Sequence, residues 1–173
     1  MTTKWTFPII CSQYAEEGAE DFHISWDSSS FSSIRSNDSN SLGTMGTLEH
    51  SARSPKHDIT NKTYFLKITG FNFNQLPTAL TGIELSLTMK RGGRITDETV
   101  SLCIRDTLIG TNKASLDLNP IKVYGGATDR WDTNLTIADL TEPSFGVVLR
   151  FQSHPHWPHR TGAFIDAVEL RIH

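Results

Sequence analysis

Apolar and polar residues alternate strictly along several stretches of the chain after Thr63. Successive side chains of a β-strand point to opposite faces of its sheet, so a period of two predicts a strand that is half buried. The clearest stretch is GIELSLTMK, with Ile83, Leu85, Leu87 and Met89 on one face. The same spacing groups Val100, Leu102 and Ile104; Phe145, Val147, Leu149 and Phe151; and Phe164, Val168, Leu170 and Ile172. YFLKITGF and PIKVYGG add two further strands, and Gly- or Asn-bearing turns separate the strands.

These strands predict an all-β fold, an antiparallel two-sheet β-sandwich of jelly-roll-like type with a loop-rich N-terminal region. Strands that alternate in this way are typical of antiparallel sheets with one face on the core and one in water. The one helical candidate is TIADL, where Thr136 can cap the N-terminus and Asp139, three residues on, completes a capping box.

The first part of the chain has a different composition. Residues 26–62 are rich in Ser, Asn, Thr and Gly, which form turns and bury little surface. Apolar residues such as Trp26 and Ile34 nevertheless recur there, which favours short strands and long loops over disorder. We therefore expect residues 1–62 to form an N-terminal arm or outer layer, and residues 63–173 to form the sandwich core.

Composition excludes several classes of protein. A chain of 173 residues suits one domain, and a net charge of −3 provides no basic face for nucleic acid. The apolar patch from Phe7 to Cys11 is too short for a signal peptide or a membrane span. We therefore expect no membrane partner and a protein that is made and kept in a cytosol, or released by lysis. Cys11 and Cys103 lie in no motif, and Cys103 is expected to be a small core residue.

Catalytic motifs are missing from the sequence, and we expect neither an enzyme nor a cofactor. Asp97 and Glu98 are adjacent, so a strand would direct them to opposite faces, which does not suit a pair of glycosidase carboxylates. The pattern favours a solvated strand start for both. Asp166 lies on the core face of its strand pattern and is expected to hydrogen-bond a neighbouring loop.

The segment HPHWPHR concentrates three histidines, two prolines and a tryptophan near the C-terminus. His154 and His156 are spaced by two and would share a face of a strand, as zinc ligands can, and His159 is the candidate third ligand. Pro155 and Pro158, however, each lack a backbone donor and prevent a regular strand. We expect a stiff surface loop without metal, in which Trp157, Arg160 and His156 contact another chain.

Two glycine pairs predict turns. In RGGR, Gly92 and Gly93 would form a hairpin with Arg91 and Arg94 at its tip. In YGGATDRW, Gly125 and Gly126 would take positive φ, Asp129 would hydrogen-bond the turn backbone, and Trp131 would anchor the turn in the core.

Several motifs occur in an order that resembles a β-sandwich module of tailed-bacteriophage structural proteins. The resemblance covers residues 64–172 and rests on ITGFNFNQLPTALTGIELSLTMK, DETVSL, GTNKA, YGGATDRWDTNLTIADLTEPSFGVVL and AFIDAVELRI. It implies a non-enzymatic virion protein, made in the bacterial cytoplasm and carried on the capsid surface. The expected type is a capsid decoration (cement) protein that binds the major capsid protein or other virion proteins as a homo-oligomer, most simply a trimer.

Three alternatives stay open from the sequence. Within the same class, the chain could be a tail, baseplate or receptor-binding component. A carbohydrate-binding β-sandwich module would use an exposed aromatic, with Trp157, Trp131 and Trp5 as candidates. A lytic or metal-dependent enzyme is disfavoured by the missing motifs. The residues that we expect to contact partners are Trp157, Arg160, His156, Trp5, Arg91 and Arg94.

Overall fold

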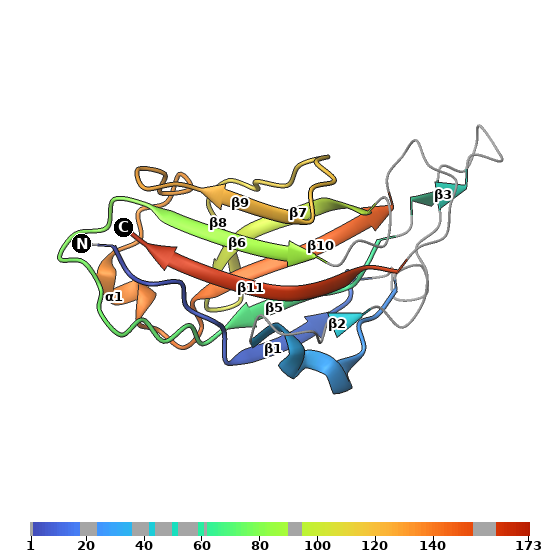
Figure 1. The fold of residues 1–173 in the computed structure, drawn as a ribbon, viewed down its shortest axis with the longest axis horizontal. Helices are drawn as coiled ribbons and strands as arrows, with labels where there is room; N and C mark the ends of the chain where they lie inside the picture. The colour runs from blue at the N-terminus through green and yellow to red at the C-terminus, as the bar shows by residue number, and fades with distance from the viewer. Residues whose placement is uncertain are drawn as a thin grey trace.

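The computed structural model describes residues 2–17, 24–35, 42–43, 50–51, 59–60, 62–89, 95–153 and 162–173. Two antiparallel sheets form an all-β sandwich, as expected (Figure 1). The five-stranded sheet has the order β1 (Ile10–Tyr14), β5 (Phe65–Thr69), β10 (Gly146–Ser153), β7 (Ile95–Ile104), β8 (Thr107–Ile109). The four-stranded sheet has the order β2 (Leu42–Gly43), β11 (Phe164–Ile172), β6 (Ile83–Met89), β9 (Ile121–Gly125). A separate pair joins β3 (His50–Ser51) to β4 (Ile59–Thr60).

The core lies between the two sheets and is made of the alternating residues. On β6 every second residue is buried, beginning with Ile83 and ending with Met89, as the period-two pattern predicts. On β10 the predicted inward residues Val147, Leu149 and Phe151 are fully buried. The opposite face of β10 is largely buried as well, because β10 is the central strand of its sheet and has neighbours on both sides. Cys103 is buried, as predicted, but it lies on the outer face of the five-stranded sheet.

Consecutive strands of the sandwich mostly belong to different sheets. β5, β7, β8 and β10 lie in one sheet, and β6, β9 and β11 lie in the other. The expectation of a hairpin at RGGR is therefore wrong, because β6 and β7, which flank it, are not neighbours in a sheet. Residues 90–94 themselves, including Arg91 and Arg94, lie outside the described residues. The described hairpin is β7–β8, whose two turn residues Arg105 and Asp106 both have positive φ.

Strand β11 contains an irregularity that the sequence pattern did not reveal. Its register against β6 shifts between Ile165 and Ala167, which is the signature of a β-bulge. The extra residue of the bulge inverts which side chains of β11 face the core in the part of the strand before the bulge. Ile165 is consequently fully buried and Phe164 is 37% exposed. The expectation that Phe164 points into the core is wrong.

The described residues before position 62 share the core with those after it. β1 pairs with β5 as an edge strand, and Thr6 forms a bridge to Leu170 of β11. Trp26 is buried against Phe151 and donates its indole N–H to the carbonyl of Tyr64. Where short strands and loops were expected, residues 28–35 instead form a 3₁₀ helix, η1 (Ser28–Arg35).

The expected helix is present as α1 (Ile137–Leu140). The Thr136 side chain accepts from the backbone N–H of Asp139, and the Asp139 carboxylate accepts from the backbone N–H of Thr136. This reciprocal pair is the predicted capping box.

Candidate functional site

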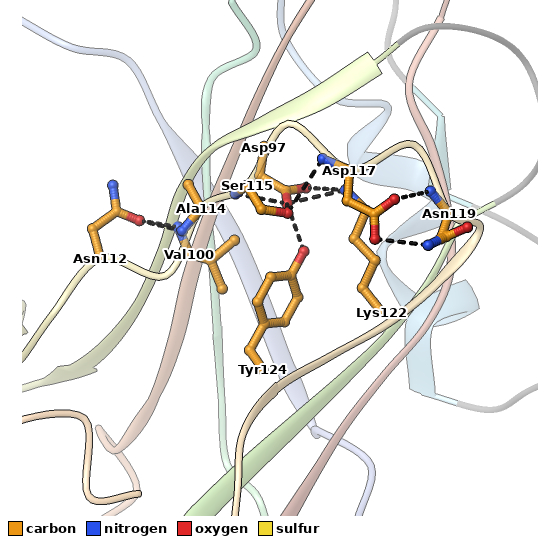
Figure 2. A network of polar contacts seen from close by, with 9 residues as sticks. All are labelled: Asp97, Val100, Asn112, Ala114, Ser115, Asp117, Asn119, Lys122 and Tyr124. Atoms are coloured by element: carbon orange, nitrogen blue, oxygen red, sulfur yellow. Dashed lines mark hydrogen bonds and ion pairs between the residues drawn. The ribbon is translucent and has the colours of Figure 1, made fainter.

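Strand β9 presents polar side chains to the interior and apolar ones to solvent. Lys122 and Tyr124 are buried, whereas Ile121 and Val123 are more than half exposed. β9 pairs with β6, so its inward side chains point toward the other sheet. There they meet Asp97 of β7, and Figure 2 shows the three side chains converging. An ionic cluster is thus formed across the sandwich, from residues 25 and 27 positions apart in sequence.

The Asp97 carboxylate is the centre of this buried cluster. Its two oxygens each lie 3.0 Å from Nζ of Lys122. Oδ2 also accepts from the Tyr124 hydroxyl at 2.6 Å and from the backbone N–H of Ser115 at 3.3 Å. The Lys122 side chain is 4% exposed and the Asp97 side chain 0%. The expectation of a solvated strand start is therefore wrong for Asp97.

Burial is also the main cause of a raised pKa at Tyr124, and the charge of Asp97 adds to it. A tyrosine in this setting stays protonated and keeps donating its hydrogen bond.

A buried ion pair is expensive to build, because both charges lose their hydration. Replacing such a pair by apolar residues is often neutral or stabilising, whereas removing one partner typically costs about 3–5 kcal/mol. The Lys122–Asp97 pair is therefore weak evidence for stability alone. Its presence inside a small sandwich calls for another explanation.

The loop of residues 110–120 closes over this cluster and is held by side chains (Figure 2). Asn112 accepts from the backbone N–H groups of Val100 and Ala114 and donates to the carbonyl of Glu98. Asp117 accepts from the backbone and side-chain amides of Asn119. The bonds of Asn112 tie the loop to β7, and those of Asp117 fix the turn within the loop.

On the solvent side, the same segment carries a run of exposed apolar residues. We call it the apolar strip, and it consists of Leu116 (60% exposed), Leu118 (46%), Ile121 (64%) and Val123 (56%). Among the described strands, β9 lies at one edge of its sheet. The backbone N–H of Met89 donates to the carbonyl of Pro120, and the backbone N–H of Gly126 donates to the carbonyl of Ile83. These two bonds show which residues of β9 direct their backbone groups toward β6, because such residues alternate along an antiparallel strand. By that alternation, the backbone N–H and C=O groups of Ile121 and Val123 point to the open edge.

A groove of 340 Å³ lies on the outer face of the five-stranded sheet. Tyr14, 43% exposed, stacks on Phe65 with ring centroids 5.0 Å apart at one side of it. Lys67 and Asp106 form an ion pair at the groove, and Ser12 and Leu108 also line it.

The Cys103 thiol also lines this groove, but burial raises its pKa to about 11. It is not a reactive nucleophile at neutral pH.

The predicted turn residues have distinct outcomes. Gly125 has a φ of 80°, whereas Gly126 is not among the glycines with positive φ, so that expectation is wrong for Gly126. Asp129 accepts from the backbone N–H of Trp131, as predicted. Trp131 is fully buried and donates its indole N–H to the carbonyl of Ile83 at 2.9 Å.

Of the residues expected to contact partners, Trp5 is described. It is half-buried, and the guanidinium of Arg171 lies 4.3 Å from the centre of one of its rings. Asp166, expected to bond a neighbouring loop, has a buried Oδ1 without a hydrogen-bond partner in the described structure. The remaining candidates fall outside the described residues: His154, His156, Trp157, His159, Arg160, Arg91 and Arg94.

Comparison with known proteins gave no match to a protein-family model, to a curated protein or to a solved structure. In the described parts of the chain, no three His, Cys, Asp or Glu side chains group so that they could hold a metal ion. The helices described here are too short and too polar for any of them to cross a membrane.

Proposed function

We propose that the chain is a non-enzymatic structural protein of a tailed-phage virion, a capsid decoration protein that binds the major capsid protein lattice. The observation that carries the proposal is the apolar strip on the open edge of the sandwich, defined by Leu116, Leu118, Ile121 and Val123. The ordered motifs from Ile68 to Ile172 support the finer assignment to virions by resemblance.

The apolar strip suits contact with another protein for two reasons. Its four side chains present apolar surface within eight residues of sequence, and clustered apolar surface marks interaction sites. The open backbone groups of β9 favour a strand as the partner, because an unpaired edge is a template for pairing with another chain. Pro120 and the inward-pointing Lys122 are devices that limit pairing at such an edge, yet Ile121 and Val123 still present apolar surface to solvent.

A homo-oligomer is the simplest use of this edge. We propose a trimer on the capsid, in keeping with the phage-like resemblance, in which each copy contributes its apolar strip to a neighbouring subunit. The four residues of the strip would then be buried on assembly, while the ionic cluster inside each sandwich would be unchanged.

The test is a double variant, Ile121→Lys with Val123→Lys. Both side chains point to solvent, so the variant should fold normally and yet lose self-association and capsid binding. Sedimentation of the purified protein, alone and with capsids, measures both. The control is Leu108→Lys, which changes a 45% exposed leucine on β8, an edge strand of the other sheet.

Two results would count against this proposal. A wild-type chain that stays monomeric at high concentration and has no affinity for capsids argues against a decoration protein. Unchanged association of the double variant excludes the apolar strip as the contact. Electron microscopy of labelled protein distinguishes the capsid from the tail or baseplate, which is the alternative location.

A carbohydrate-binding module is the second candidate, and the groove on the five-stranded sheet favours it. A sugar binder needs an exposed aromatic ring, and Tyr14 provides one beside the polar groups of Ser12 and Lys67. Trp131 is excluded as a stacking platform because it is fully buried. Calorimetric titration with oligosaccharides, compared with the Tyr14→Ala variant, tests this function. Saturable binding lost in the variant would favour it over the virion proposal.

A further inference from the structure

We propose that Lys122 and Asp97 condense with one another to form an intramolecular isopeptide bond that links the two sheets of the sandwich. This self-modification goes beyond the proposed structural function and does not depend on it. It would make use of the buried ionic cluster, which the proposed contacts at the apolar strip leave unexplained.

The first support is the geometry of the pair. Both carboxylate oxygens of Asp97 lie 3.0 Å from Nζ of Lys122. The carbon between those oxygens therefore lies roughly 3–3.5 Å from the nitrogen, which is the separation of reacting atoms in a near-attack arrangement. Attack requires the nitrogen above the plane of the carboxyl group, and a small rotation about the Cβ–Cγ bond of Asp97, a torsion with broad minima, would bring it there.

The second support is the exclusion of water. The Lys122 and Asp97 side chains are 4% and 0% exposed. The pair is thereby held out of bulk water. Condensation releases water, so a dry site also favours the amide over its hydrolysis.

The reaction balances within the pair. One proton passes from the Lys122 ammonium to Oδ1 of Asp97, and the free amine attacks the carboxyl carbon. The new carbon–nitrogen bond forms as negative charge develops on Oδ2. A second proton then passes from nitrogen to Oδ1, the bond from carbon to Oδ1 breaks, and one water molecule leaves. The amide retains one hydrogen on nitrogen, and no oxidant or further reactant takes part.

The contacts of Asp97 favour Oδ2 as the oxygen that stays. Both oxygens accept from Lys122, but Oδ2 alone also accepts from the Tyr124 hydroxyl at 2.6 Å and from the backbone N–H of Ser115 at 3.3 Å. Two donors aimed at one oxygen stabilise the charge that develops there during attack. Tyr124 touches the reacting carboxyl group and is assigned the role of this donor.

The Lys62–Glu98 pair provides a matched comparison within the same chain. Its nitrogen and oxygen are 2.8 Å apart, closer than in the Lys122–Asp97 pair. Its side chains are, however, 30% and 22% exposed, and water reaches them. Proximity is thus common to both pairs, while full burial and two further donors on one oxygen distinguish Asp97. We expect Lys62 and Glu98 to remain unlinked.

Intact-mass spectrometry of the purified, folded full-length chain is the test. The wild-type protein should be lighter than its sequence mass by one water molecule, and a protease digest should yield a branched peptide that joins Lys122 to Asp97. The loss should disappear in Lys122→Arg and persist in Lys62→Arg. In Asp97→Asn the departing molecule should change from water to ammonia, and in Tyr124→Phe the loss should be slower.

A folded wild-type chain whose mass equals that of its sequence overturns the proposal, and this measurement requires no variant to fold. A water loss that persists in Lys122→Arg overturns it as well, because the link would then lie elsewhere. Unfolding the wild-type chain in denaturant should leave an existing bond in place, whereas an ion pair would separate.

Discussion

Gly125 and Trp131 fit together at a distance that only a glycine allows. A Cβ on Gly125 would lie 2.1 Å from the carbonyl oxygen of Ile83 and 2.6 Å from the indole nitrogen of Trp131. The indole N–H needs that position, since it donates to the same Ile83 carbonyl. Trp131 itself has a φ of 57°, an uncommon conformation for a bulky residue. The turn after β9 is therefore built around one close contact.

Substitution of Gly125 by alanine should destabilise the fold by more than about 1 kcal/mol, because positive φ and a backbone clash combine. Gly126 is the matched control. Its added Cβ would be 4.0 Å from the nearest heavy atom, and its φ lies outside the left-handed region. Gly126→Ala should change the free energy of unfolding by less than about 0.5 kcal/mol. Urea unfolding of both variants measures the difference, and equal losses would contradict this account of the turn.

The bulge in β11 shows how one element can mislead a pattern. The alternation in FIDAVELRI places Phe164 and Val168 on one face, but the register shift between Ile165 and Ala167 separates them. Val168 remains buried, and Ile165 takes the buried position in front of the bulge.

This arrangement predicts opposite outcomes for two neighbouring residues. Ile165→Ala should cost about 2–5 kcal/mol, because it removes buried methyl groups and leaves a cavity. Phe164→Ala should cost much less, since the ring is 37% exposed. Thermal or urea unfolding of the two variants tests the register. If Phe164→Ala proved the more damaging change, the bulge would be misplaced.

Alternation alone was sufficient to predict the fold class and the inward face of β6, because periodicity is a local signal. It did not predict which strands are neighbours, so RGGR was interpreted as a hairpin although β6 and β7 lie in different sheets. The ionic cluster was missed for the same reason. Asp97 meets Lys122 only through tertiary folding, and PIKVYGG does not reveal which of its faces is buried.

At the scale of the whole molecule, ionised carboxyl groups connect distant parts of the chain. Burial disfavours ionisation of Glu98, but hydrogen bonds from Lys62 and Thr99 outweigh it and hold its pKa below the usual value. At Asp129, burial is likewise outweighed by bonds from Lys113 and from the backbone of Trp131, and the pKa is lowered. Both groups bind protons less readily in the folded chain than in the unfolded chain.

Stability should therefore fall with acid. The contribution of these two groups is complete above the ordinary carboxyl pKa of about 4, and it is lost as the pH falls through their lower folded-state values. We expect the urea midpoint to decrease between about pH 5 and pH 2. Glu98→Gln should have a smaller decrease than wild type over this range. A midpoint that is constant or rises as the pH falls would contradict the assigned hydrogen bonds.

The strand order has a consequence for synthesis on the ribosome. β10 is the central strand of the five-stranded sheet, and β11 lies between β2 and β6 in the other. Both are made after every other strand of the sandwich. A nascent chain that already contains β1 and β5 still lacks the strand that connects them to β7. Neither sheet can close early, so the emerging chain must stay soluble until β10 and β11 appear, and a product that stops before them has no core to fold around.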